Sequence, residues 1–112
     1  MKYSYVLKPY AAMIVRGTCI AWDAFKKPGA RESAPPGLRE RMAQAECAVR
    51  TVLHEEATPN TVRSWIRCIA YAIPFSRAPQ EIMSCISEAQ YKRRKSAMTV
   101  AIAEKMGLVT TA

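Results

Sequence analysis

The residues best suited to chemistry in this sequence are cations placed where they could grip phosphate groups. Lys92, Arg93, Arg94 and Lys95 form a block of four consecutive cations inside a stretch with helical spacing. Because successive residues on a helix point in different directions, local partners cannot neutralise the whole block, which favours a polyanion, an acidic protein surface or water. Phosphate contacts by this block would give binding that is independent of base sequence and weakens with salt.

A second group of polar residues follows a short turn between two segments with helical spacing. The segment 38–56, the turn 57–60 and the segment that starts at Thr61 together resemble a helix-turn-helix unit. In such a unit the second helix enters the major groove, so the resemblance implies that Arg63 and Arg67 contact nucleic acid. The turn contains no glycine and the first helix is long for the motif. An ordinary helical hairpin is therefore the alternative interpretation.

Aromatic residues indicate a different function, which is docking on another protein. Trp65, Tyr71 and Phe75, with Arg77 nearby, are of types that are prominent at protein interfaces. If these side chains form an exposed patch, we expect an inhibitor or adaptor that docks on a host complex, of the kind that phages and mobile elements encode as accessory proteins. The basic block would then face an acidic protein surface or the nucleic-acid site of the target.

Groups for catalysis or metal binding lack the spacing that either function needs. His54 is the single histidine, and its neighbours Glu55 and Glu56 do not face it on a helix. The four cysteines, at positions 19, 47, 68 and 85, contain no close pair of the kind that binds zinc. The sequence therefore predicts a protein that is not an enzyme and that uses no metal and no cofactor.

The composition indicates a helical domain with an anionic partner. The chain has 112 residues, of which 50% are apolar, and a net charge of +8. This length supports one domain with a modest core, and the positive charge favours nucleic acid, a nucleoprotein or an acidic protein surface as the partner. A helical bundle that dimerises and has a purely structural role is a third possibility, and the sequence leaves the oligomeric state open. Since we find no membrane span and no secretory signal, we expect a cytoplasmic protein with reduced cysteines.

The elements that must position these residues follow from the hydrophobic spacing. We expect an all-α fold, a compact bundle of four or five helices in one domain that covers residues 1–112. Residues 1–27 would hold the first helix, preceded by a short strand or an extended arm over residues 3–7. A loop rich in proline and glycine covers 28–37, and the helical body covers 38–107.

The helices are expected at four or five places. The first spans about 10–26, with Tyr10, Ile14, Gly17, Ala21 and Phe25 facing the core. The second spans 38–56, and the third begins with Thr58 as cap and Pro59 and ends before Pro74. The fourth opens at Pro79 and either continues to Gly107 or gives way to a fifth helix that Ser96 caps.

Overall fold

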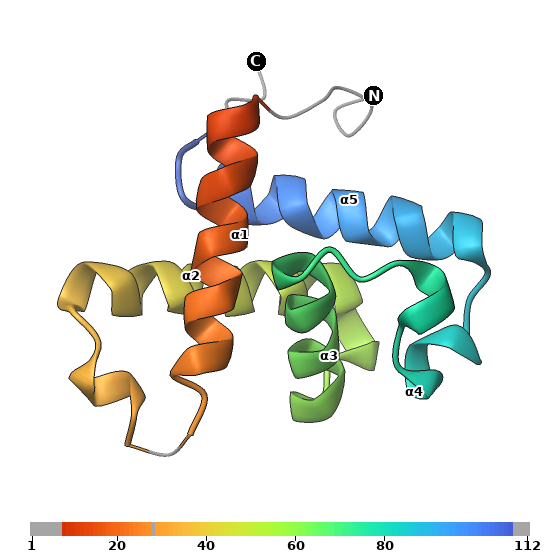
Figure 1. Cartoon of the computed structure of the whole chain (residues 1–112), viewed down its shortest axis with the longest axis horizontal. Helices are drawn as coiled ribbons and strands as arrows, with labels where there is room; N and C mark the ends of the chain where they lie inside the picture. Colours follow the sequence, from red (N-terminus) through yellow and green to blue (C-terminus); the bar gives the residue numbers. More distant parts are fainter. Residues whose placement is uncertain (1–7, 28, 109–112) are drawn as a thin grey trace.

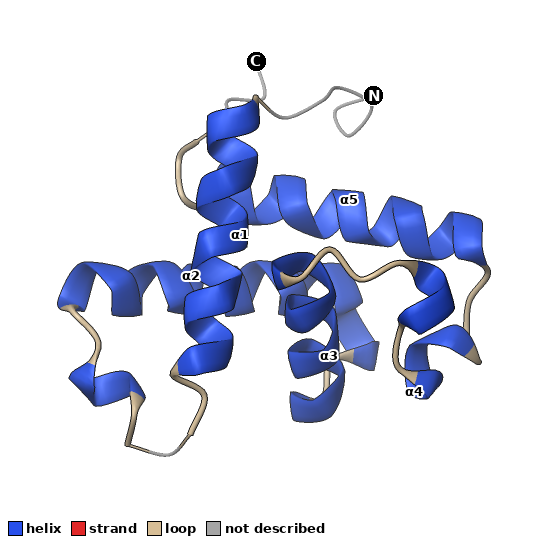
Figure 2. Cartoon of the chain, in the orientation of Figure 1, coloured by secondary structure: helices blue, strands red, loops and turns tan. Residues whose placement is uncertain are grey.

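The computed structural model of the chain describes residues 8–27 and 29–108, and 77% of these residues are helical. The α-helices of the described part are α1 (Pro9–Ala24), α2 (Pro36–Leu53), α3 (Pro59–Ala70), α4 (Gln80–Met83) and α5 (Glu88–Lys105). Short 3-10 turns lie between them: η1 (Arg31–Ser33), η2 (His54–Glu56) and η3 (Phe75–Arg77). These residues contain no strand (Figure 2). The predicted all-α bundle is confirmed, while the arm or strand expected over 3–7 lies outside the described residues.

Four helices enclose the core. The long helices α2 and α5 pack together, α1 crosses them at a steep angle, and α3 packs against α1 (Figure 1). The largest fully buried side chains come from all four of these helices: Val15, Cys19, Met42, Val49, Val62, Trp65, Ile66, Cys68, Tyr91, Met98 and Ile102. The rings of Trp65 and Tyr91 stack with their centroids 5.3 Å apart, and Phe75 packs at a tilt against Tyr91. This aromatic cluster fixes α3 and η3 against α5.

The helices α2 and α3 form where the spacing predicts them. The bounds of α2 differ, since it covers Pro36–Leu53 instead of 38–56, and the last three predicted residues form η2. The stripe predicted for α2 faces the core, with Met42 and Val49 fully buried. At the start of α3 the Thr58 Oγ1 accepts a hydrogen bond of 3.1 Å from the backbone N–H of Thr61, and Pro59 stands in the first turn. Both are strong start signals because the first backbone N–H groups of a helix have no partner within it.

The buried face of α1 differs from the prediction. Its buried residues are Ala11, Val15, Thr18, Cys19 and Trp22. The expectation that Tyr10, Ile14 and Gly17 face the core is wrong, since all three are exposed, whereas Ala21 and Phe25 are half-buried. Because α1 is apolar around most of its circumference, the spacing alone could not show which stripe faces the bundle.

The C-terminal helices also begin and end elsewhere than predicted. Neither one long helix from Pro79 nor a break at Ser96 occurs, because α4 ends at Met83 and α5 begins after Ser87. The Ser87 Oγ accepts a hydrogen bond from the Gln90 backbone N–H, and the Gln90 side-chain oxygen accepts one from the Ser87 N–H. This reciprocal capping box starts α5. At its other end Gly107 has a φ of 75°, which confirms it as the residue that ends the helix.

Candidate nucleic-acid interface

Two of the predicted phosphate ligands, Arg63 and Arg67, lie on the exposed side of α3. Val62 and Ile66 bury the opposite side of this helix, as the helix-turn-helix interpretation expects. Both arginines line a surface groove of about 380 Å³, which we name the arginine groove. Its lining residues are Asn60, Arg63, Ser64, Arg67, Ile73, Arg77, Pro79 and Glu81.

The arginine groove carries an excess of positive charge. Arg77, which the sequence suggested as a docking residue, stands in the same groove as the two arginines of α3. The single carboxylate of the groove, Glu81, accepts a hydrogen bond of 2.8 Å from the Ser64 hydroxyl. Arg63 and Arg77 form no ion pair with any described residue. Guanidinium groups without an ion-pair partner are well suited to bind phosphate oxygens, because their planar fork can donate two parallel hydrogen bonds.

A second hollow opens on the other side of Arg63. It has a volume of about 320 Å³, and we name it the Trp22 hollow. Its lining residues are Trp22, Lys26, Lys27, Arg31, Glu46, Arg50, Pro59, Val62 and Arg63. Since Arg63 lines both hollows, the cations of the two hollows adjoin each other at α3. We name the seven cations of the two hollows the basic band: Lys26, Lys27, Arg31, Arg50, Arg63, Arg67 and Arg77.

The sequence did not single out the first four cations of the basic band. Lys26 and Lys27 follow the end of α1, Arg31 begins η1, and Arg50 lies in the last turn of α2. A further pocket of about 460 Å³ continues from the Trp22 hollow along α2, and it shares Arg31 and Arg50 with the hollow. In the sequence, only the adjacent pair Lys26 and Lys27 indicates this part of the basic surface.

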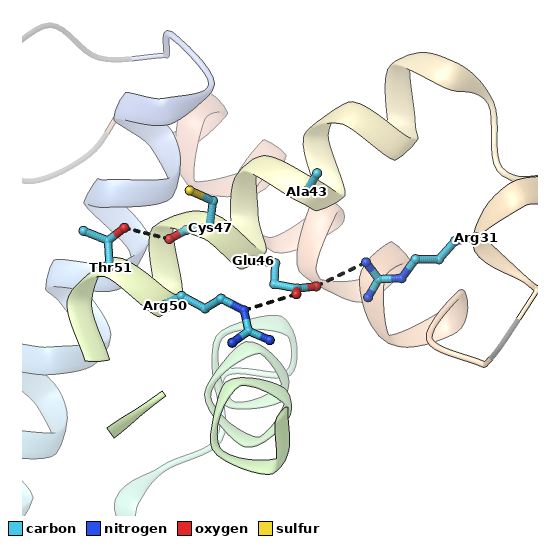
Figure 3. A pocket seen from close by; sticks show the side chains of 6 residues that line it. All are labelled: Arg31, Ala43, Glu46, Cys47, Arg50 and Thr51. Carbon is cyan, nitrogen blue, oxygen red and sulfur yellow. Dashed lines mark hydrogen bonds and ion pairs between the residues drawn. The ribbon is translucent and has the colours of Figure 1, made fainter. Parts of the chain in front are cut away.

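Glu46 forms ion pairs with two cations of the basic band. Figure 3 shows its carboxylate between Arg31 and Arg50, with ion-pair distances of 3.2 and 3.3 Å. The Trp22 Nε1 also donates a hydrogen bond of 3.0 Å to this carboxylate. Burial favours a higher pKa for Glu46, but the hydrogen bond from Trp22 and the charge of Arg31 outweigh it and hold the pKa below its ordinary value.

Arg31 is held in place by a second contact in addition to Glu46. Its guanidinium carbon lies 4.8 Å from the centroid of the Trp22 ring, which is within the range of a cation–π interaction. A side chain fixed in this way loses less conformational entropy when it binds a ligand. Two contacts, with Glu46 and with the Trp22 ring, therefore restrain Arg31 beside the Trp22 hollow.

Asp23 anchors two further cations of the basic band. Its carboxylate lies 3.0 Å from the Lys26 amine and 3.9 Å from the Arg67 guanidinium, and it accepts a hydrogen bond of 2.8 Å from the Tyr71 hydroxyl. Burial favours a higher pKa for Asp23, but the hydrogen bonds from Tyr71 and Lys26 outweigh it and keep the pKa below its ordinary value. The band cations without an ion pair in the described part of the chain are Lys27, Arg63 and Arg77.

The basic block of α5 does not form one phosphate-binding surface. Arg94 pairs with Glu56 at 2.9 Å and lies 6.0 Å from the centroid of the Trp65 ring. Lys95 donates a hydrogen bond of 3.1 Å to the backbone oxygen of Ile73, and burial lowers its pKa. These two side chains hold α5 to η2 and to the segment after α3.

The other two cations of the block, Lys92 and Arg93, project into solvent. Lys92 pairs with Glu88 at 3.3 Å on the surface of α5, and both side chains are largely exposed. None of the residues 92–95 lines the arginine groove, the Trp22 hollow or the pocket beside it. The structure therefore does not bring the basic block together with Arg63 and Arg67 in one site.

The aromatic residues suggested for protein docking do not form a surface patch. Trp65 is 2% exposed and Phe75 is half-buried, and both pack on Tyr91. The expectation of an exposed Trp65 is wrong because its position three residues after Val62 places it on the buried stripe of α3. Tyr71 is exposed, but its hydroxyl is bound to Asp23.

Groups that could bind a metal ion do not gather in the described ranges. Within them, no three His, Cys, Asp or Glu residues lie close enough to share an ion. Cys19 and Cys68 belong to the core, and burial raises the pKa of Cys19 to about 12, whereas Cys47 and Cys85 are exposed. No helix in residues 8–27 and 29–108 combines the length and the apolar character that a membrane crossing requires.

Comparison with known proteins finds no relative. The chain matches no protein-family model, no curated protein and no solved structure.

Proposed function

We propose that this protein binds nucleic acid without catalysing a reaction, and that the basic band is its contact surface. The observation that carries this proposal is the position of Arg63 in both the arginine groove and the Trp22 hollow. Through it, cations from the segment after α1 and from η1, α2, α3 and η3 form one surface. Together the two hollows hold seven cations and two carboxylates, a balance that attracts a polyanion over several ångströms and releases its counterions on contact.

The placement of α3 in the basic band supports a binding mode like that of a helix-turn-helix protein. Asn60, Arg63 and Arg67 recur on the exposed side of this helix, opposite Val62 and Ile66. Such a helix can place polar side chains against base edges while flanking cations contact phosphates. Lys27 on one side of α3 and Arg77 on the other supply flanking contacts of this kind.

The basic block of α5 contributes less to the proposed binding than the basic band. Arg94 and Lys95 stabilise the fold through their contacts with Glu56 and the Ile73 carbonyl. Lys92 and Arg93 add general attraction for a polyanion, which acts over about 10 Å at moderate salt. The alternative function, docking on a host complex through Trp65 and Phe75, lacks a supporting surface because these side chains are buried or half-buried.

Fluorescence anisotropy with labelled duplex DNA and single-stranded RNA, recorded across a salt series, tests the proposal. Because three band cations have no ion pair, we expect the logarithm of the binding constant for duplex DNA to fall with the logarithm of the salt concentration with a slope of about −3 or steeper. The comparison between duplex and single strand identifies the preferred form. Absence of binding to both at about 50 mM salt would exclude the proposed function.

A further inference from the structure

Exposed large apolar side chains in the described part of the chain gather on one face of α1. Tyr10, Met13, Ile14 and Ile20 are 55%, 71%, 37% and 41% exposed. A fifth such residue, Tyr71, is bound through its hydroxyl to Asp23 of the same helix. Surfaces of this kind on soluble proteins commonly mark interaction sites.

The spacing of this face is that of a helix which packs along another helix. The exposed positions 10, 13, 17, 20 and 24 alternate steps of three and four residues, and all are apolar or small. A Cβ atom placed on Gly17 would meet no other atom within 4 Å, so the surface above the middle of the stripe is open. Steps of three and four bring one helix face against a partner along its whole length.

We infer that this face pairs in antiparallel orientation with α1 of a second copy of the chain, about a twofold axis. The occupant follows from the self-complementary order of large and small residues along the stripe. When Ile20 faces Gly17 of the second copy, the same twofold axis sets Met13 against Ala24 of the second copy. Each layer then joins one large and one small side chain, which allows the two helices to approach closely.

Charged residues at the edge of the stripe fit the same register. Arg16 and Asp23 lie seven residues apart on one edge, and each directly precedes a stripe residue, Gly17 or Ala24. Arg16 forms no ion pair with any described residue. In an antiparallel pair the same edges of the two helices lie side by side, so Arg16 meets Asp23 of the second copy, and the twofold axis repeats this pair. A parallel arrangement would set this edge against Ile14 and Ala21, where no ion pair can form.

Asp23 can accept this additional partner. In its own chain it has contacts with Lys26, Arg67 and Tyr71, and a carboxylate offers about four lone-pair sites. Its side chain remains 12% exposed, so the pair forms at the edge of the interface. The charge complementarity therefore selects the orientation of the two copies more than it adds affinity.

The size of the face sets the expected strength of the dimer. α1 has 16 residues, which corresponds to a length of about 24 Å. One helix face of this length provides less contact than the roughly 800 Å² per partner of a standard stable interface. We expect a reversible dimer that forms in the micromolar range. This inference does not depend on nucleic-acid binding, and its tests contain no nucleic acid.

Sedimentation velocity over about 5 to 300 μM protein measures the dimer directly. We expect the parent protein to change from monomer to dimer over this range, and Met13→Glu or Ile20→Glu to raise the dissociation constant at least about tenfold. The matched control Ser96→Glu adds the same charge at an exposed position of α5 and should leave the constant within about twofold. Circular dichroism verifies that each variant is folded. A parent that stays monomeric throughout, or a control that weakens the dimer as much, would overturn the inference.

Cysteine cross-linking tests the register. Gly17→Cys and Ile20→Cys are introduced into separate chains in which the exposed Cys47 and Cys85 are replaced by serine. The two chains are mixed and oxidised with oxidised glutathione. Antiparallel pairing predicts that the cross-link between the two different chains forms several-fold faster than either cross-link between identical chains. Faster cross-linking between identical chains would overturn the antiparallel register.

Discussion

The Trp22 indole N–H donates a hydrogen bond to the Glu46 carboxylate, with 3.0 Å between nitrogen and oxygen. This bond ties α1 to the middle of α2 beside the basic band. The same carboxylate holds Arg31 and Arg50. One acidic residue therefore stabilises the contact between two helices and also neutralises part of the surface that we propose binds a polyanion. Its removal should affect stability and binding in opposite directions.

We expect Glu46→Gln to weaken the fold and to strengthen nucleic-acid binding. The free energy of unfolding should fall by about 1 kcal/mol, because two partly exposed ion pairs are lost while the amide oxygen can still accept from Trp22. The affinity for duplex DNA should rise several-fold, since Arg31 and Arg50 lose their competing partner. Urea denaturation and anisotropy measure the two effects. Glu40→Gln, at an exposed position of α2, is the control, and a fall in affinity for Glu46→Gln alone would contradict the prediction.

Acid should destabilise the fold through Asp23 and Glu46. The folded protein holds the pKa of both groups below the ordinary values of 3.8 and 4.5, so the unfolded chain binds protons more readily. The stability that these groups contribute is fully present above the ordinary values and is lost as the pH falls through the lowered ones. Melting temperatures measured from about pH 7 to about pH 2.5 should show this loss, and Glu46→Gln should reduce it. An equal loss in parent and variant would exclude Glu46 as a cause.

The backbone at the end of α2 predicts a stabilising substitution. His54 has a φ of 57° and a ψ of −118°, a conformation that side chains with a Cβ atom rarely adopt. We expect His54→Gly to raise the free energy of unfolding by about 1 kcal/mol, because glycine adopts positive φ without steric cost. Thr51→Gly, one turn earlier in the helix, should lower it by about 0.5 kcal/mol, because glycine is a poorer helix former than threonine. Urea denaturation tests both variants, and destabilisation by His54→Gly would refute the proposed strain.

The buried position of Trp65 predicts a structural role. Trp65→Ala should lower the free energy of unfolding by about 3–5 kcal/mol, because it removes the ring that stacks on Tyr91 and leaves a cavity. Trp65→Phe retains an aromatic ring there and should cost clearly less. Tyr71→Ala, at an exposed aromatic residue with one hydrogen bond, should cost about 1 kcal/mol. Equal costs for Trp65→Ala and Tyr71→Ala in urea denaturation would show that the indole is not part of the core.

Much of the fold could be predicted because its signals are local. The cap at Thr58 and Pro59 and the apolar stripe of α2 each lie within a few turns of one helix. The buried face of α1 could not be predicted, since it depends on which side of this helix the other helices cover. The start of α5 was missed because apolar residues continue through α4 and conceal the capping box of Ser87 and Gln90.

The candidate site was predictable only where it follows one helix. Arg63 and Arg67 lie one turn apart, so the sequence places them on the same side of α3. The cations near Trp22 come from elements that meet only in the folded chain. Likewise, the sequence shows the charge of Arg94 but not its partner Glu56, which lies 38 residues away.

The basic band is tested most directly by two variants that lose the same charge. One replaces Arg63, Arg67 and Arg77 by glutamine, and the other replaces Lys92, Arg93 and Lys105, which are exposed on α5, by glutamine. Anisotropy with duplex DNA across a salt series gives the affinity and the salt dependence of each. We expect the band variant to lose at least about tenfold in affinity and its salt slope to become shallower by about two to three, while the α5 variant changes by less than about threefold. Equal losses in the two variants would contradict the basic band as the contact surface.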